Sequence, residues 1–257
     1  MMKLLKKLLF KGEQKTDVEK PIIQHNGFCP TCDSPVLFTA YNSWLRDHLL
    51  CSNCGSIPRE RALMHVIETY YPDSRQLKIH ESSPGKRGAS EKLSAQCSGY
   101  LGSHYDRSVP LGSCGASGYQ SEDLEKLTFK DESFDLVITQ DVVEHLFDPS
   151  KAFAEIARTL KPGGAHIFTV PLVNQLNTSE QCALIDTDGQ VRYLKEPDYH
   201  GNPIDAKGSL VTMHWGYDIC EHIFRSSGLF TTIIQIDKLD LGIRAELVEV
   251  LLSYKAK

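Results

Sequence analysis

The sequence of 257 residues lacks several features that would place it in a special class. No apolar run approaches the ~20 residues that a membrane-spanning helix needs, and Lys3, Lys6 and Lys7 interrupt the start of the chain before a signal-peptide core could form. Its 18 glycines and 12 prolines are too few for a fibrous or low-complexity protein. An excess of basic residues is missing too, since 28 Lys and Arg face 33 Asp and Glu. We therefore expect a cytosolic globular protein that buries a substantial core.

Cysteine is present at eight positions, and four of these form two close pairs. The pairs are Cys29-Pro-Thr-Cys32 and Cys51-Ser-Asn-Cys54. Spacing of this kind lets four thiolates surround one tetrahedral Zn²⁺, and four protein ligands leave no open position for catalysis. We expect residues 27–57 to form a zinc ribbon whose structural metal supplies much of its folding free energy. The alternative is two unrelated redox pairs or free thiols. The scattered cysteines, which we expect to be reduced, are Cys97, Cys114, Cys182 and Cys220.

The first 26 residues are expected to be a basic tail and linker. Leucines recur at helical spacing in residues 1–11, with lysines between them. One interpretation is a helix that makes weak contact with a membrane surface or docks a partner. The other is a frayed tail, because helices this short are marginal in isolation.

Beyond the ribbon, a connecting helix is predicted within residues 58–74, and strands then alternate with helices up to the C-terminus. Ser56 is the candidate N-cap of the connecting helix. Its expected apolar face consists of Ala62, Leu63, Val66, Ile67 and Tyr70. Strands are predicted at residues 77–81, 100–103, 134–139, 165–170, 230–236 and 247–254, and helices near 89–96, 148–160 and 217–226. Such alternation predicts an α/β fold with a doubly wound parallel sheet.

Three runs carry a family resemblance: LEKLTFKDESFDLVIT at 124–139, VEHL at 143–146 and EIARTLKPGG at 155–164. In order and spacing they resemble the type 11-like S-adenosylmethionine-dependent methyltransferases of the Rossmann-like class. The resemblance covers residues 75–257, and the cysteine pairs followed by Arg59-Glu-Arg61 resemble a subgroup with an N-terminal zinc ribbon. It implies a seven-stranded sheet that binds S-adenosylmethionine at the carboxyl ends of its first four strands, which agrees with the general rule for open α/β sheets.

In this family the first strand ends in an acidic residue and a glycine-rich turn. Glu81 matches the acid and Gly85 the second glycine, but Ser83 replaces the first glycine, which narrows the approach of the backbone to the methionine moiety. The second strand normally ends in an acid that binds the ribose hydroxyls. His104 occupies that position here and Asp106 follows two residues later, so either is a candidate, and an ordinary surface loop is the alternative.

The resemblance assigns further cofactor contacts to the next two strand ends. Asp123 lies six residues before Phe129, where the family places an acid that accepts a hydrogen bond from the adenine amino group. Leu124 is expected beside the adenine ring, and Gln140 and Asp141 close to the sulfonium and its methyl group.

A hydroxyl acceptor must lose a proton as the methyl group arrives, and histidine is the side chain best suited to accept it near neutral pH. The histidines in the appropriate part of the fold are His145, His200 and His214. We expect His200 first, because it lies in a polar, hydrogen-bonding segment, and His214 second, because the adjacent Trp215 could stack on a sugar. His145 belongs to a Glu-His pair that is often structural in the family.

The sequence thus predicts an enzyme that O-methylates a small molecule or a glycan. One alternative is a noncatalytic module that keeps the cofactor fold and binds a partner through the ribbon. A second is an RNA methyltransferase that uses the ribbon, although the acidic charge balance and the lack of an Asn-Pro-Pro-Tyr-type motif argue against nucleic acid. The acceptor and the oligomeric state stay open.

Overall fold

The computed structural model describes residues 20–116, 118–201 and 207–257. The tail at residues 1–11, with its predicted amphipathic helix, lies outside the described residues. No helix in the described part of the chain has the length and apolarity that a membrane span requires.

The N-terminal module is a small antiparallel sheet with the cysteine pairs at its turns. β1 (Ile23–Cys29) pairs with β2 (Ser34–Ala40), and β2 pairs with β3 (Leu50–Cys51). The short helix α1 (Leu45–His48) connects β2 to β3. The few buried side chains of this module, such as Phe38 and Leu49, form a core of their own.

The rest of the chain forms a seven-stranded sheet in the order β15-β16-β8-β7-β4-β5-β6. Its strands are β4 (Lys78–Ser82), β5 (Gly99–His104), β6 (Gln120–Ser121), β7 (Phe134–Gln140), β8 (Leu160–Thr169), β15 (Phe230–Ile234) and β16 (Val250–Tyr254). The pairs from β6 to β8 are parallel, and β16 runs antiparallel to both of its neighbours. The predicted doubly wound α/β sheet is confirmed.

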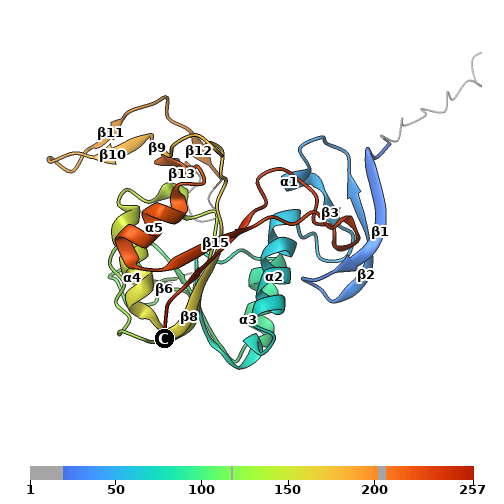
Figure 1. Cartoon of the computed structure of the whole chain (residues 1–257), viewed down its shortest axis with the longest axis horizontal. Helices are drawn as coiled ribbons and strands as arrows, with labels where there is room; N and C mark the ends of the chain where they lie inside the picture. Colours follow the sequence, from blue (N-terminus) through green and yellow to red (C-terminus); the bar gives the residue numbers. More distant parts are fainter. Residues whose placement is uncertain (1–19, 117, 202–206) are drawn as a thin grey trace, which may run out of the picture.

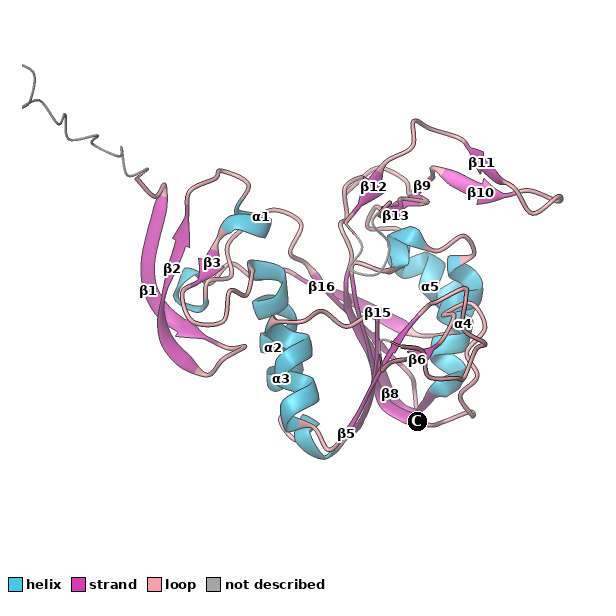
Figure 2. Cartoon of the chain, turned by 180° about the vertical axis from the view of Figure 1, so that it is seen from behind, coloured by secondary structure: helices cyan, strands magenta, loops and turns pink. Residues whose placement is uncertain are grey.

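Helices cover both faces of this sheet (Figures 1 and 2). α2 (Pro58–Tyr70) and α3 (Gly88–Gln96) lie on the face toward the ribbon, and α4 (Pro149–Thr159) and α5 (Ile219–Ser227) lie on the other. Each pair encloses its own apolar core against the strands. Short turns of helix occur at η1 (Ser74–Gln76), η2 (Val143–His145) and η3 (Leu239–Leu241).

The segment between β8 and α5 contributes three small two-stranded sheets that gather at one end of the domain (Figure 2). They are β9 (Glu180–Gln181) with β14 (Met213–His214), β10 (Ala183–Ile185) with β11 (Val191–Tyr193), and β12 (Tyr199–His200) with β13 (Ser209–Leu210).

Two details of the connecting helix differ from the sequence prediction. The N-cap residue is Ile57 rather than Ser56, and its backbone N–H donates to Glu60 Oε2 at 3.1 Å. Ser56 is used elsewhere, because its hydroxyl lies 3.1 Å from an Arg61 Nη1 donor and 3.4 Å from Cys29 Sγ. Tyr70 is 56% exposed and does not share the buried apolar face.

The ribbon packs firmly against the sheet domain. Arg61, fully buried on α2, donates to Leu49 O at 2.7 Å within the ribbon and to Gly242 O at 2.7 Å between β15 and β16. From α3, Lys92 Nζ donates to Pro30 O at 2.8 Å, beside the first cysteine pair. Figure 1 shows η3 beside β1, and a Cβ at Gly27 would lie 2.3 Å from Asp240 O. The expected boundary between residues 27–57 and 75–257 is therefore bridged by buried polar contacts.

Candidate cofactor and acceptor site

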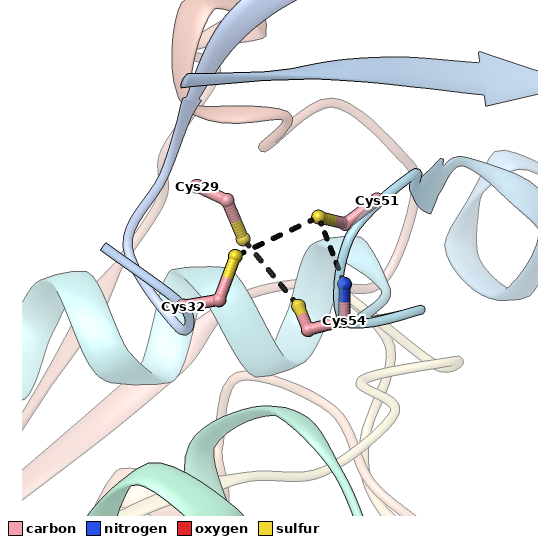
Figure 3. A group of neighbouring side chains, drawn as sticks. All are labelled: Cys29, Cys32, Cys51 and Cys54. Atoms are coloured by element: carbon pink, nitrogen blue, oxygen red, sulfur yellow. Dashed lines mark hydrogen bonds between the residues drawn. The ribbon is translucent and has the colours of Figure 1, made fainter. Parts of the chain in front are cut away.

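Four cysteine side chains converge at the turns of the ribbon (Figure 3). Cys29 Sγ lies 3.8 Å from Cys54 Sγ, and Cys32 Sγ lies 3.9 Å from Cys51 Sγ. A tetrahedral Zn²⁺ with bonds of about 2.3 Å holds its sulfur atoms about 3.8 Å apart. The backbone N–H groups of Asn53 and Cys54 point at Cys51 Sγ, as donors to a metal-bound thiolate do. The cluster therefore fits a structural zinc.

At the carboxyl end of β4, Glu81 is completely buried and accepts hydrogen bonds from α3, β5 and β7. Ser90 Oγ and Gln140 Nε2 donate to Oε1 at 2.7 and 2.8 Å, and the Tyr100 hydroxyl donates to Oε2 at 2.8 Å. Burial raises the pKa of the Glu81 carboxyl despite these donors. Among the described residues, the carboxylate is linked to the following loop only through Ser90, whose hydroxyl also accepts from the Gly85 backbone N–H.

The loop itself keeps the backbone of a glycine turn although it starts with serine. Ser83 adopts a left-handed conformation with φ of 57°, the region that glycine occupies without strain. Gly85 is exposed, and its backbone N–H donates to Ser90 Oγ at 3.0 Å. A serine in this conformation adds local strain to the turn.

Gln140, the last residue of β7, has one unsatisfied polar atom at this edge. Its Nε2 donates to Glu81 Oε1 and to Ser90 Oγ, whereas its buried Oε1 has no hydrogen-bond partner among the described residues. Buried carbonyl oxygens normally have a donor. The ammonium group of a methionine moiety is a donor of the right kind, so the residues here fit the cofactor.

The two ribose candidates lie at the end of β5 in different environments. His104 is buried edge-on against Tyr119 at 4.6 Å between ring centres, and burial lowers its pKa, so the imidazole is neutral at pH 7. Asp106 Oδ1 accepts hydrogen bonds from the backbone N–H and the hydroxyl of Ser108, at 2.8 and 2.6 Å, and stabilises a turn.

The loop after β6 contains the adenine candidates. Asp123 Oδ1 accepts from the Glu125 backbone N–H at 2.9 Å, while Oδ2 has no partner within the described chain. Leu124 is 4% exposed and belongs to the core beneath α4. The Leu124 side chain therefore packs in the core under the loop and leaves little surface for contact with an adenine ring. Glu122, which the sequence analysis did not select, is buried and accepts from the Thr128 backbone N–H at 2.8 Å.

Asp141 differs most from its expected role beside the sulfonium. Its Oδ2 lies 2.7 Å from Arg46 Nη2 and 3.2 Å from Arg59 Nε, and its Oδ1 accepts from Thr169 Oγ1 at 2.9 Å. Burial acts to raise the pKa of Asp141, but Arg59 and Arg46 outweigh it and lower the pKa to about 2. Both oxygens are engaged within the protein, so the Asp141 side chain joins β7 to the ribbon, and its expected place beside the sulfonium stays a prediction. Arg46 itself lies in α1 and had no sequence signal.

Two of the three candidate bases meet beside Glu144. His145 Nε2 and His200 Nδ1 each lie 3.7 Å from Glu144 Oε1, and the two imidazole rings meet edge to face at 5.1 Å. Glu144 and His145 belong to η2, directly after β7, and His200 comes from β12. The structure therefore brings together residues that are more than fifty positions apart in the sequence.

His214 does not join this group. It is half-buried on β14, opposite Glu180 of β9. The adjacent Trp215 is fully buried, with its ring 6.4 Å from Phe153 and 5.2 Å from His222. The expectation that Trp215 stacks on a sugar is therefore wrong, because its indole belongs to the core.

A cavity of about 330 Å³ opens at the same carboxyl edge, beyond β8 and β15. Its lining is mixed: the acidic and amide residues are Gln175, Gln235, Asp237, Glu246 and Glu249, and the apolar ones are Ile236, Ala245, Leu247 and Val248. Arg46 Nε donates to Leu247 O at 2.9 Å, which connects the wall of this cavity to the Asp141 cluster. A volume of this size suits a small molecule.

Part of the chain is similar to known methyltransferases. Residues 103–168 match a family model described as a methyltransferase domain. A dimethylglycine N-methyltransferase from Parasynechococcus marenigrum (strain WH8102) is 46% identical over 48 residues, which are 19% of this chain and 17% of that protein. The chain thus spans about a sixth of the length of this curated relative.

Solved structures of similar fold include an S-adenosylmethionine-dependent methyltransferase from Mesorhizobium loti. It is 19% identical with a TM-score of 0.47, and the match covers 75% of this chain and 97% of that one. The 1,6-didemethyltoxoflavin-N1-methyltransferase of Burkholderia thailandensis is 13% identical with a TM-score of 0.44, over 77% and 79% of the two chains.

The strand order and the family match concern the same part of the chain. The family model spans β7, α4 and most of β8, which contain the runs that carry the sequence resemblance. Residues 103–168 therefore match a methyltransferase domain, and they lie within a seven-stranded α/β sheet that follows a four-cysteine module.

Proposed function

We propose that the protein transfers a methyl group from S-adenosylmethionine to a hydroxyl of a small molecule or a glycan. The observation that supports this most is the cluster of Glu144, His145 and His200, because it places proton-accepting groups directly after β7. In an open α/β sheet that edge is where ligands bind. The loop after β4, Gln140, His104 and Asp123 would hold the cofactor.

S-adenosylmethionine supplies a methyl group on a positively charged sulfur. The acceptor oxygen forms a bond to the methyl carbon, the electrons of the carbon–sulfur bond return to sulfur, and the hydroxyl proton is released. Glu144 beside His200 raises the pKa of the imidazole, which makes it a stronger proton acceptor. The cluster thus supplies a group that accepts the hydroxyl proton of an alcohol acceptor, which the methyl donor alone does not supply.

The chemistry of the cavity favours a hydroxyl-rich acceptor over an anionic one. Glu246 and Glu249 on its wall repel negative charge, whereas Asp237 is paired with Arg244. One buried oxygen of Glu249 has no hydrogen-bond donor among the described residues. Hydroxyl groups of a polyol or sugar are donors that satisfy such oxygens.

We further propose that the four-cysteine module binds one structural Zn²⁺. Its ligands would be Cys29, Cys32, Cys51 and Cys54. The metal would keep α1 in place, and with it Arg46, whose guanidinium binds Asp141 at the end of β7. The ribbon then supports the active edge of the sheet instead of recognising nucleic acid.

Cofactor binding gives the first test. Changing Asp123 to Ala is expected to weaken S-adenosylmethionine binding by ~1–3 kcal/mol, because the adenine amino group loses its acceptor. Isothermal titration calorimetry measures this, with the exposed Asp188→Ala as a matched control that leaves affinity unchanged. If the unaltered protein binds no cofactor at millimolar concentration, the noncatalytic partner-binding alternative replaces the enzyme.

Turnover gives the second test. A screen of sugars, phenols, lipids and RNA, followed by S-adenosylhomocysteine release, identifies the acceptor. On that acceptor, His200→Ala should lower turnover by ~100-fold without changing cofactor affinity, since it removes a side chain that helps to take the proton from the acceptor hydroxyl. The control is His48→Ala, an exposed histidine in the ribbon. Unaltered turnover in His200→Ala would remove His200 from the mechanism, and methylation of RNA alone would favour the nucleic-acid alternative.

A further inference from the structure

Glu144 is a buried carboxylate without a hydrogen-bonded partner. The residue is 2% exposed, and neither Oε1 nor Oε2 accepts a hydrogen bond from any described residue. No Lys or Arg in the described part of the chain lies within ion-pair distance of it, and Arg59, the neighbouring guanidinium, pairs with Asp141 instead. A buried charge normally requires an opposite charge or a metal ion.

The orientation of His145 indicates what this charge faces. Its Nδ1–H donates to Leu210 O at 2.9 Å, which leaves the lone pair of Nε2 directed at Glu144 Oε1, 3.7 Å away. A lone pair and a carboxylate oxygen repel each other unless a cation lies between them. Histidine ligands of metal ions characteristically donate their second ring nitrogen to a backbone carbonyl in this way.

His200 completes the group from a separate element. Its Nδ1 lies 3.7 Å from the same Glu144 oxygen, and its Nε2 lies 3.9 Å from Asp198 Oδ2. The β12–β13 ladder places His200 opposite Ser209, next to the Leu210 whose carbonyl orients His145. The paired strands β12 and β13 therefore position both imidazoles beside the carboxylate.

We propose that Glu144, His145 and His200 bind a divalent first-row cation. One ligand atom from each residue lies within 4.8 Å of the others, which is compatible with a common metal. Two imidazoles and one carboxylate suit Mn²⁺, Fe²⁺, Co²⁺ or Zn²⁺ and leave coordination positions open. The inference deepens the proposed function and rests on it, and it changes the part that His200 plays: with a cation bound, His200 is a ligand and not the proton acceptor, and an acceptor hydroxyl that occupies an open position on the cation loses its proton more easily.

This site differs from the ribbon in the donors that it offers. The ribbon has four sulfur ligands and suits Zn²⁺, whereas the Glu144 site has nitrogen and oxygen ligands only. Mn²⁺ prefers such donors over thiolates. It is therefore a selective probe of the second site in protein whose ribbon is already loaded with zinc.

The experiment titrates the full-length, zinc-loaded chain with Mn²⁺ and counts free ions by electron paramagnetic resonance. We expect one Mn²⁺ per chain in the unaltered protein and at least tenfold weaker binding in Glu144→Gln and in His200→Asn. His48→Gln, which alters an exposed histidine of the ribbon, should bind Mn²⁺ normally. Equal binding by all four proteins, or no binding by the unaltered chain, overturns the inference.

Thermal unfolding separates ligand loss from misfolding. Mn²⁺ should raise the melting temperature of the unaltered protein and leave that of Glu144→Gln unchanged, because a ligand stabilises only a state that binds it. Without metal, Glu144→Gln should melt no lower than the unaltered protein, since the substitution removes an uncompensated buried charge. Cofactor binding and turnover without Mn²⁺ binding would contradict the cation site and leave the proposed methyltransferase activity standing. Mn²⁺ binding without turnover on any acceptor would support the cation site and contradict the proposed activity.

Discussion

Chelation of the ribbon metal is expected to unfold residues 20–57 while the seven-stranded sheet stays folded. Structural zinc binds cysteine ribbons with ~10–16 kcal/mol of apparent free energy, which in so small a module is largely folding free energy. The apolar core available without metal consists of few side chains, among them Phe38 and Leu49. Amide hydrogen exchange should therefore show protection lost in β1 and β2 and retained in β7 and β8.

The substitution Cys29→Ser removes one of the four zinc ligands and should have the same effect as chelation. It should lower zinc content well below one equivalent and give the same exchange pattern as chelation. Cys114→Ser, at an exposed cysteine outside the cluster, is the matched control and should keep the metal. A Cys29→Ser protein with full zinc content and native exchange in β1 would contradict a structural metal at this site.

The second large effect is expected from Asp141→Asn. The substitution removes the negative charge between Arg46 and Arg59 and leaves two largely buried guanidinium groups without a counter-charge. Loss of one partner from a buried ion pair costs ~3–5 kcal/mol. Asn tolerates the left-handed backbone found here, where φ is 52°, so the change tests charge and not strain. Urea unfolding measures the difference.

Asp148→Asn is the control for this variant. Asp148 also pairs with a cation, Lys151, but the lysine side chain is 68% exposed and the aspartate 37%, and solvent-exposed pairs contribute less than about 1 kcal/mol. If Asp141→Asn destabilises the protein no more than Asp148→Asn, the ribbon is not held to β7 through this cluster.

The carboxyl group of Asp141 also predicts how the stability of the protein depends on pH. The pKa of Asp141 is lowered from 3.8 to about 2, so its contribution is complete above pH 4 and is lost as the pH falls through 2. A shift of this size corresponds to about 2 kcal/mol by linkage. The unaltered protein should lose this amount between pH 4 and pH 2, and Asp141→Asn should lack that component.

Features that depend on local pattern were predictable. Short continuous apolar runs predicted strands close to β4, β7 and β8. A strand that is buried on both faces needs such a run, and this requirement does not depend on which strands lie beside it. Two-residue spacing within each cysteine pair likewise determines where the thiolates point, so the ribbon cluster was predictable from residues 29–54 alone. The family motifs then indicated which strand ends form the ligand edge.

Side-chain partners across the fold were not predictable. The ion pair of Asp141 with Arg46, 95 positions away, had no sequence signal and forms because the ribbon folds back over the end of β7. Trp215 was expected on the surface beside His214 and is buried, because α5 closes over it. His200 meets Glu144 only through the β12–β13 ladder. Local periodicity decides secondary structure, whereas these pairings depend on which elements meet in space, and only the tertiary structure sets that.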